Sequence, residues 1–192
     1  MDYFLPKNEF KAERGDLLIS EPFLPDPNFE RTVILLCEHD EHGSFGFVLN
    51  KQSTVEFQEV IEGGADFSEK LFIGGPVQQD TLHFIHRAPD QMESGKEIVN
   101  GIYWGGDFER LLSLINTKQL NVADYRFFLG YSGWSEGQLE NELKAKSWIV
   151  YKQPTAEKLF DLDPEKLWKE ALKELGGKFK MFSNYPEDPR LN

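Results

Sequence analysis

The segment 31–40 (RTVILLCEHD) constrains the fold more than any other feature of the chain. Val33 to Cys37 form an unbroken apolar run rich in branched side chains, which is typical of a strand that is buried on both faces. The polar residues EHGS that follow predict a turn, and residues 45–51 (FGFVLNK) predict the returning strand. The two strands together predict a β-hairpin.

Other short apolar segments, separated by glycine, proline and polar residues, predict further strands. These segments are residues 15–20, 70–76, 81–87, 97–106, 124–132 and 147–152. Residues 21–30 (EPFLPDPNFE) contain three prolines, which fix φ and remove amide donors, so they predict a stiff loop. Many strands with interspersed helices, and no regular βαβ alternation, predict an α+β fold.

Capping residues and helical spacing predict several helices. Ser53 or Thr54 would cap a short helix over residues 53–64, and residues 136–146 predict another helix. Asp107 is the predicted cap of a helix whose apolar side chains share one face. These side chains are Phe108, Leu111, Leu112 and Ile115.

The C-terminal helix has the most complete set of signals. Asp163 is its predicted N-cap, Pro164 its first residue and Gly176 its end. Its buried face is predicted to consist of Leu167, Trp168, Ala171, Leu172 and Leu175. We therefore expect one α+β domain over residues 1–177 and a C-terminal tail over residues 178–192.

Charge and composition disfavour several kinds of partner. The chain has 192 residues and a net charge of −12, without a cluster of Lys and Arg. Nucleic-acid binding needs a concentrated positive surface, so direct binding to DNA or RNA is disfavoured. No apolar run approaches the roughly 20 residues that cross a bilayer, and residues 1–16 lack the pattern of a signal peptide. A single cysteine fits a reducing compartment, so we expect a cytoplasmic protein with no membrane partner.

Residues 133–137 (GWSEG) match the G-x-S-x-G elbow that presents a nucleophilic serine in α/β-hydrolases. In that fold the histidine of the triad follows the serine, whereas all four histidines here precede Ser135. A helix start explains more residues. Ser135 as N-cap and Gln138 at N3 would form a capping box, and Trp134 and Leu139 would form a hydrophobic staple. We therefore interpret Ser135 and Gln138 as structural caps.

The remaining polar patterns predict no metal site and no cofactor. Residues 37–42 (CEHDEH) contain several metal-ligand types, but they fall at a strand end and turn, where charged side chains usually face water. His83 and His86 would point to opposite faces of a strand. Cys37 is interpreted as a small buried hydrophobe, because a neighbouring Glu38 disfavours the thiolate.

Four segments, taken in order, resemble the bacterial YqgE/AlgH family. They are residues 15–51, 71–86, 127–150 and 159–176, roughly half of the chain. The resemblance rests on the motifs D-P-x-F-x-R, L-x-E-H, G-x-V-L-N, G-G-P-V-Q and G-Y-x-G-W-x-x-G-Q-L-E. Residues 100–112 (NGIYWGGDFERLL) depart from the usual form of that family.

The resemblance implies a bifurcated mixed β-sheet curled into a pseudo-barrel, with flanking helices. It implies no established catalytic activity, cofactor or ligand. Some members of the family carry the label of a transcriptional regulator because of a link to alginate production, which concerns a pathway rather than DNA contact. In similar sequences the position that matches Ser135 is often glycine or another small residue, which favours a cap over a nucleophile.

We therefore expect a binding or regulatory protein that acts through a protein partner or a small ligand. Its surface is predicted at the ends of strands, where functional loops commonly lie. The candidate residues are Glu38, His39, Asn50, Gly75, Gln78 and Trp134. The alternative is a hydrolase or a thiol-based enzyme, with Ser135 or Cys37 as its nucleophile.

Overall fold

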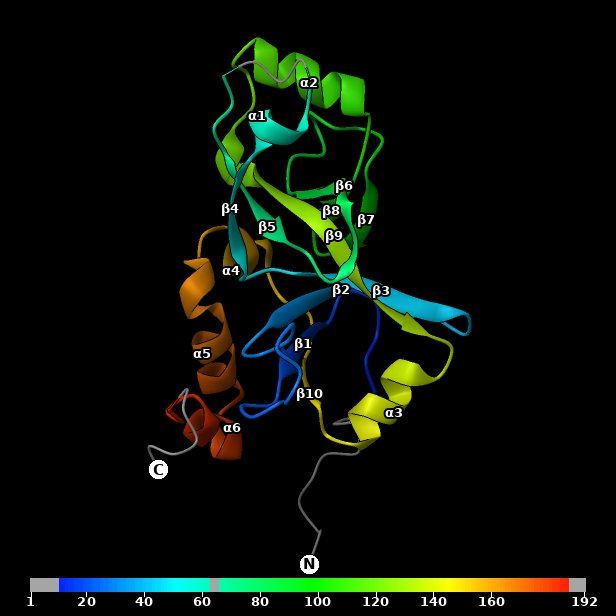
Figure 1. Cartoon of the computed structure of the whole chain (residues 1–192), viewed down its shortest axis with the longest axis vertical. Helices are drawn as coiled ribbons and strands as arrows, with labels where there is room; N and C mark the ends of the chain where they lie inside the picture. Colours follow the sequence, from blue (N-terminus) through cyan, green and yellow to red (C-terminus); the bar gives the residue numbers. More distant parts are fainter. Residues whose placement is uncertain (1–10, 63–65, 187–192) are drawn as a thin grey trace, which may run out of the picture.

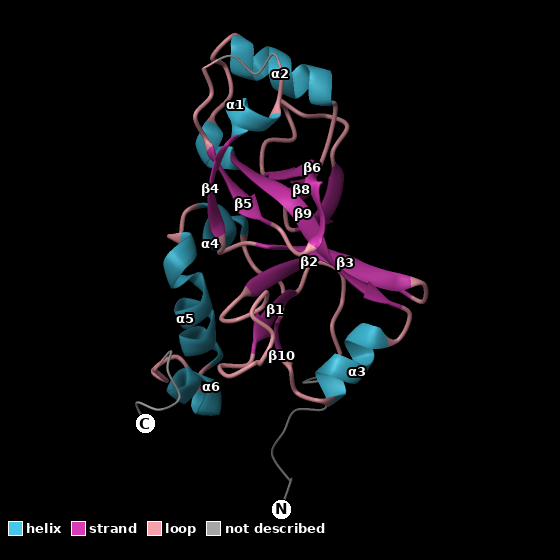
Figure 2. Cartoon of the chain, viewed as in Figure 1, coloured by secondary structure: helices cyan, strands magenta, loops and turns pink. Residues whose placement is uncertain are grey.

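The computed structural model describes residues 11–62 and 66–186, which form ten strands and seven helices (Figure 1 and Figure 2). The strands are β1 (Leu17–Ser20), β2 (Val33–Asp40), β3 (Gly43–Val48), β4 (Gln52–Glu56), β5 (Lys70–Ile73), β6 (Val77–His86), β7 (Lys96–Val99), β8 (Ile102–Trp104), β9 (Tyr125–Ser135) and β10 (Trp148–Tyr151). The helices are α1 (Phe57–Val60), α2 (Phe108–Asn116), the 3-10 helix η1 (Val122–Asp124), α3 (Gln138–Lys144), α4 (Ala156–Phe160), α5 (Pro164–Leu175) and α6 (Gly177–Phe182). Predictions for residues 1–10, 63–65 and 187–192 lie outside the described part.

The strands belong to one branched sheet. Its main path runs β10-β1-β2-β3-β9-β6-β8-β7, and β4 and β5 branch from it at β9. β5 is parallel to β9, whereas the pairs along the path are antiparallel, so the sheet is mixed. β10 and β7 end the path without pairing with each other, so the sheet does not close. The predicted α+β class and bifurcated sheet are confirmed, and the implied pseudo-barrel is open.

The predicted hairpin is the antiparallel pair β2–β3. β2 lies between β1 and β3, and the side chains of Val33 to Leu36 are 0% exposed. Leu35 and Cys37 pack into one apolar cluster, whereas Ile34 and Leu36 pack into another. Both faces of β2 are therefore covered, which is why its sequence shows no alternation of apolar and polar residues.

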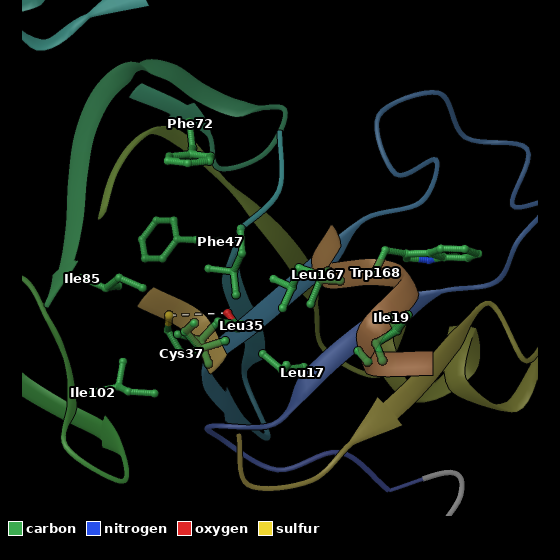
Figure 3. Packing of buried hydrophobic residues seen from close by; sticks show 14 of the residues in the cluster. Leu17, Ile19, Leu35, Cys37, Phe47, Phe72, Ile85, Ile102, Leu167 and Trp168 are labelled. Carbon is green, nitrogen blue, oxygen red and sulfur yellow. Dashed lines mark hydrogen bonds between the residues drawn. The ribbon is translucent and has the colours of Figure 1, made fainter. Parts of the chain in front are cut away.

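Apolar clusters hold the helices against the sheet. Leu35 and Trp168 belong to the cluster that joins β1, β2 and β3 to α5 (Figure 3). On the other face of β2, Leu139 attaches α3. A further cluster, which includes Phe127 and Leu111, joins β9 and β6 to α2 at the opposite end of the molecule (Figure 1).

The predicted caps of the two longest helices are confirmed. The Asp107 side chain accepts hydrogen bonds from the first backbone amides of α2, and Asp163 does the same for α5. Gly176 ends α5 at φ 68°, a conformation that glycine adopts without a Cβ clash. Phe108, predicted on the buried face of α2, is instead 38% exposed.

The helix predicted over residues 53–64 is wrong at its start. Ser53 and Thr54 lie in β4, and α1 begins only after Glu56, its N-cap. β4 pairs with β5, with Gln52 opposite Phe72, and this pairing keeps the segment extended. Tertiary pairing therefore overrides the local capping signal.

The predicted tail begins with a helix, α6, rather than an irregular segment. Phe179 and Phe182 pack against the cluster of β1, β2 and α5. The guanidinium of Arg31 donates a hydrogen bond to the carbonyl of Tyr185 over 2.7 Å. These contacts attach residues 177–185 to the sheet.

Candidate functional site

A cavity of about 610 Å³ lies beside the β2–β3 hairpin, where β3 meets β9. Two carboxylates, of Glu38 and Asp40, line it. Its lining residues include the ring-bearing residues His42, Phe45, His83, Trp104, Tyr131 and Trp134. Its volume falls within the range of about 300–1,000 Å³ that is usual for ligand pockets. We call it the aromatic cavity.

The strand register explains why this cavity exists. Glu38 of β2 is opposite Phe45 of β3, which in turn is opposite Gly133 of β9. Residues that are paired across strands point to the same face, so Gly133 leaves a gap in a row of side chains. A Cβ atom on Gly133 would lie 3.3 Å from Cε2 of Tyr131, so the tyrosine ring borders this gap.

A bulge beside the cavity sets the position of Tyr131. The β6–β9 register shifts between Val77 and Leu82, opposite the part of β9 that contains Gly130. Gly130 has φ +66°, and an added Cβ would lie 2.6 Å from the Val77 carbonyl oxygen. Such bulges redirect side chains. Here Tyr131 lies next to His83, with 6.0 Å between the ring centroids.

The rings form a continuous wall. The centroid of Phe45 is 4.8 Å from that of Trp104 and 6.0 Å from that of Tyr131, both in edge-to-face geometry. All three side chains are half-buried and pack against the cluster of β1, β2 and α5. They are therefore held from behind while part of each ring remains accessible from the cavity.

The cavity contains two acidic side chains, and Lys96 balances the charge of one of them, Glu38. Oδ1 of the other, Asp40, accepts a hydrogen bond from the backbone amide of His42 over 2.8 Å. Burial lowers the pKa of His83, whose Nε2 lies 3.0 Å from Oγ1 of Thr81. His83 is therefore neutral at pH 7 and adds no positive charge to the wall.

The structure brings two of the six predicted binding residues, Glu38 and Trp134, to the aromatic cavity. Gly75 is buried, and an added Cβ there would lie 2.2 Å from the backbone of Tyr131, so close packing explains this glycine. Gln78 is exposed outside the cavity wall, and its carbonyl accepts a hydrogen bond from the side chain of Thr81.

Asn50 and His39 also lie apart from the cavity wall. The side chain of Asn50 accepts a hydrogen bond from Val33 N and donates one to the Arg31 carbonyl, so it ties the start of β2 to the chain after β3. Its environment is a separate hollow near α5. The six residues therefore do not form one surface.

The structure places His39 in a row of polar groups that the sequence did not predict. Its Nδ1 is 2.6 Å from Oγ of Ser44, and its Nε2 is 3.7 Å from a carboxylate oxygen of Glu140. The order serine, histidine, carboxylate is that of a catalytic triad. However, the last distance exceeds that of a hydrogen bond, so Glu140 does not fix the orientation of the ring.

Ser135 is not the N-cap of α3, so that prediction is wrong. β9 extends to Ser135, which pairs with Gly43, and α3 begins after Gly137, the N-cap at φ 70°. Pairing with β3 holds Ser135 in the strand, and the helix starts two residues later than predicted. Gln138 still accepts a hydrogen bond from Ser135 N over 3.1 Å, which is one half of the capping box.

A carboxylate of α3 joins the cavity wall to β10. Oε2 of Glu142 accepts hydrogen bonds from the indole nitrogen of Trp134 over 2.8 Å and from that of Trp148 over 2.7 Å. The two indoles are 6% and 3% exposed. One side chain therefore satisfies two largely buried donors, which explains the position of α3.

Cys37 lies inside the cluster of β1, β2 and α5, with 2% of its surface exposed (Figure 3). Burial is the main cause that raises the pKa of its thiol far above the ordinary value, and Glu38 raises it further while Lys96 opposes the shift. The thiol therefore stays protonated at neutral pH and is a poor nucleophile. The interpretation of Cys37 as a buried hydrophobe is confirmed.

Residues 11–62 and 66–186 contain neither a cluster of metal ligands nor a helix that could span a membrane. No three His, Cys, Asp or Glu side chains in these ranges are placed to share a metal ion. No helix in them is both long enough and apolar enough to cross a membrane.

The fold and the cavity define a mixed α+β protein with a ligand-sized aromatic hollow in its sheet. A family model described as AlgH-like (DUF179) matches residues 17–180. The chain therefore belongs to the AlgH-like family.

Relatives of this chain support the same family. The chain is 48% identical over 180 residues to a UPF0301 protein of Cytophaga hutchinsonii, which covers 93% of this chain and 98% of the relative. It is 45% identical over 186 residues to a UPF0301 protein of Chlorobium limicola, covering 96% and 99% of the two chains. These names state a family of uncharacterised proteins and no activity.

Two solved structures are similar. The solution structure of AlgH from Pseudomonas aeruginosa has a TM-score of 0.69 at 28% identity, over 97% of this chain and 98% of that one. A crystal structure from Corynebacterium diphtheriae has a TM-score of 0.71 at 23% identity, over 91% and 93% of the chains. The second likeness shows the fold alone.

Proposed function

We propose that this protein is a non-enzymatic binding protein whose aromatic cavity accepts a cationic group, an alkylammonium or a guanidinium, carried by a small ligand or a protein partner. One observation carries the proposal. Three aromatic residues and two acidic residues line the same cavity. These residues are Phe45, Trp104, Tyr131, Glu38 and Asp40.

This combination suits a cation for physical reasons. A cation over the face of an aromatic ring gains about 0.5–2 kcal/mol, most over tryptophan and in desolvated sites. Carboxylates add Coulomb attraction that grows as water is excluded. Lys96 already pairs with Glu38, whereas Asp40 has no ion-pair partner among the described residues and is the carboxylate left for a ligand. The neutral ring of His83 adds no repulsion.

The motifs on which the family resemblance rests also point to this cavity. Glu38 belongs to L-x-E-H, Val77 to G-G-P-V-Q, and Tyr131, Gly133 and Trp134 to G-Y-x-G-W-x-x-G-Q-L-E. All five line the cavity, although the motifs are far apart in the chain. A shared binding site explains why these separate motifs meet at one cavity, and strand packing alone does not.

A regulatory role would follow if the cationic group belongs to a partner protein. An acidic aromatic cavity repels phosphates, and the net charge of −12 extends this repulsion to nucleic acids in general. The family label of a transcriptional regulator is therefore better explained by contact with another protein than by contact with DNA.

The enzymatic alternative has weaker support. The thiol of Cys37 is buried and protonated, which removes the reactivity that a nucleophile requires. The hydroxyl of Ser135 contacts the side-chain oxygen of Gln138 over 3.3 Å rather than a histidine. A serine nucleophile needs an adjacent base to remove its proton.

Choline and guanidinium, titrated into the isotope-labelled protein, test the proposal. The indole N–H resonance of Trp104, identified by its loss in Trp104→Phe, should shift and saturate. The neutral isostere 3,3-dimethylbutanol should bind about tenfold more weakly, because it lacks the charge that cation–π attraction requires. Equal affinity for the charged and neutral compounds, or no response to either cation, would overturn the proposal.

Two variants locate the binding. Gly133→Val places a branched side chain in the gap beside Tyr131, so it should abolish the shift while keeping the strand, because valine suits an extended backbone. Glu38→Gln should weaken binding, whereas Glu109→Gln makes the same charge change at an exposed residue of α2 and should not. If Glu38→Gln and Glu109→Gln weaken binding equally, the cation responds to net charge and not to this cavity.

A further inference from the structure

β10 is an open edge of the sheet. It pairs with β1 alone and ends the main strand path. Figure 1 shows it at the end of the molecule where α3 and α6 lie, opposite α2. An exposed strand edge presents unpaired N–H and C=O groups, which another extended chain can pair with.

The hydrogen bonds of β1 decide which groups of β10 face outward. Ser20 N donates to Thr32 O, so the even-numbered residues of β1 bond toward β2. Glu21 N donates to Ser147 O, so the odd-numbered positions face β10. Ile149 is opposite Ile19 and therefore bonds inward.

The alternate residues Trp148 and Val150 consequently direct their backbone groups away from the sheet, because successive residues of a strand bond to opposite sides. Within the described ranges, β10 has no second strand partner, and no backbone hydrogen bond from a loop or helix reaches Trp148 or Val150. Two successive ladder positions are therefore available.

A groove of about 770 Å³ runs along this edge. One wall is β10 itself, and the opposite wall contains Leu24 and the apolar side chains of the C-terminal helices, Leu175, Phe179 and Phe182. The groove thus offers main-chain pairing on one side and an apolar surface on the other. That combination is the basis of strand addition by a peptide, in which the ladder supplies affinity and alternate side chains enter pockets.

The charge of the groove opposes that of the protein. Lys146, Lys152 and Lys178 line it against one carboxylate of the described residues, Glu21, although the chain carries a net charge of −12. Lys152 pairs with Asp16, whose Oδ2 accepts its hydrogen bond over 2.7 Å, and with Glu13 at 3.7 Å, so Lys146 contributes more of the uncompensated positive charge. A basic groove on an acidic protein attracts an acidic segment and repels a basic one.

The same charges disfavour a second copy of this chain as the occupant. Antiparallel pairing of β10 with itself would bring Lys146 of one chain near Lys152 of the other. Like charges opposite each other across strands are destabilising. A partner with its own acidic side chains has no such conflict.

We propose that the β10 groove binds an extended acidic segment of another protein, with alternating aliphatic side chains, which adds to the sheet as a strand beside β10. The backbone of the segment pairs with Trp148 and Val150. Its aliphatic side chains lie against Phe179 and Phe182, and its carboxylates lie near Lys146 and Lys152. This site is separate from the aromatic cavity and does not depend on its function.

A displayed library of random short peptides, selected on the full-length protein, tests this proposal. The enriched peptides should be acidic, alternate aliphatic with polar residues and lack proline at the pairing positions. In hydrogen exchange, the amides of Trp148 and Val150 should exchange quickly in the free protein and become protected when the best peptide is bound. Peptides for the aromatic cavity would instead be cationic, so the two sites are distinguished by charge.

Substitutions at Val150 separate main-chain pairing from side-chain contact. Val150→Pro removes an outward N–H without removing a bond to β1, a position at which edge strands accept proline. It should weaken binding of the best peptide about tenfold or more, because one buried hydrogen bond is lost and the acceptor in the peptide is left without a partner. Val150→Thr keeps the N–H and a β-branched side chain that suits a strand, and should bind the peptide within about twofold of the original chain.

Charge variants give an independent test. Lys146→Glu should weaken binding of the peptide and reduce its salt dependence. Lys70→Glu, an equal charge change at an exposed residue of β5, should do neither. The proposal is overturned if no acidic peptide is enriched, or if Val150→Pro and Val150→Thr bind equally. It is also overturned if the Val150 amide is already protected in the free protein, because this chain would then cover its own edge.

Discussion

The aromatic cavity and the β10 groove are two concave surfaces of similar size, about 610 and 770 Å³, with opposite chemistry. The cavity lies where the sheet branches, and side chains form its walls, with the acidic residues Glu38 and Asp40 among them. The groove lies at the end of the sheet, and a strand edge forms one wall, with lysines giving it positive charge.

The difference shows how one sheet can offer two kinds of recognition. Inside the sheet the backbone groups are already paired, so only side chains are left to bind a ligand, and Gly133 makes room for it. At the edge the backbone itself remains available. The two surfaces nevertheless share one support, because Glu142 holds Trp134 of the cavity and Trp148 of β10.

The largest expected effect comes from removing that shared support. Glu142→Ala leaves two largely buried indole donors without their acceptor, and each such loss costs about 1–3 kcal/mol. We expect a decrease of about 2–4 kcal/mol in the free energy of unfolding, measured by urea denaturation. Binding of choline and of the selected peptide should weaken together, because both tryptophans lose their anchor.

Glu142→Gln is the matched control for that change. Its amide oxygen can take the place of Oε2 and accept from both indoles, so this variant should keep most of the stability that the alanine variant loses. Equal losses for alanine and glutamine would mean that the negative charge, and not the shared hydrogen bonds, supports the two surfaces. If binding of only one of the two ligands weakened, the two sites would not share this support.

The pH dependence of stability gives an intermediate effect. Burial lowers the pKa of His83, in the cavity wall, and of His86, which is 0% exposed. The ordinary pKa of histidine, 6.5, applies to the unfolded chain, so below pH 6.5 the unfolded chain binds more protons than the folded one. The contribution of the two histidines to the free energy of unfolding is therefore fully present above pH 6.5 and decreases as the pH falls. The loss should reach at most about 1.4 kcal/mol per pH unit for each histidine.

Urea denaturation between pH 7.5 and 5.5 measures this slope. His86→Gln should reduce it, because the variant keeps a donor for the Gly105 carbonyl but does not titrate. The described residues of the β10 groove include no histidine, so binding of the acidic peptide should change little over the same range. A slope unaffected by His86→Gln would assign the pH dependence to other groups.

The smallest effects concern the turn between β9 and α3. Ser135→Ala should change the free energy of unfolding by less than about 0.5 kcal/mol, because Ser135 does not cap α3. Gly137→Ala should cost about 1–2 kcal/mol, because alanine is strained at φ 70°. Thermal unfolding of the two variants compares them directly, and the reverse order would restore Ser135 as the cap.

Much of the fold could be predicted because local signals agreed with tertiary packing. The unbroken run in β2, the caps Asp107 and Asp163 and the end of α5 at Gly176 are each decided within a few residues. Prediction failed where strand pairing competed with a local signal. Ser135 carries cap chemistry, yet pairing with β3 keeps it in the strand.

The candidate site was predicted only in part, because its residues converge through strand register. Glu38 and Trp134 were identified, while Phe45, Trp104 and Tyr131 resembled ordinary core aromatics in the sequence. Their accessible faces depend on Gly133 being opposite Phe45, and no local pattern specifies that register.

The sequence by itself determined the family and the α+β class, because motifs, apolar runs and caps act over short distances. Only the tertiary structure decided where the chain is hollow and where its sheet stays open. Long-range pairing sets Gly133 opposite Phe45 and leaves β10 without a second neighbour. Whether a strand borders a cavity or forms an open edge depends on its neighbours in the sheet, and those neighbours are remote in the sequence.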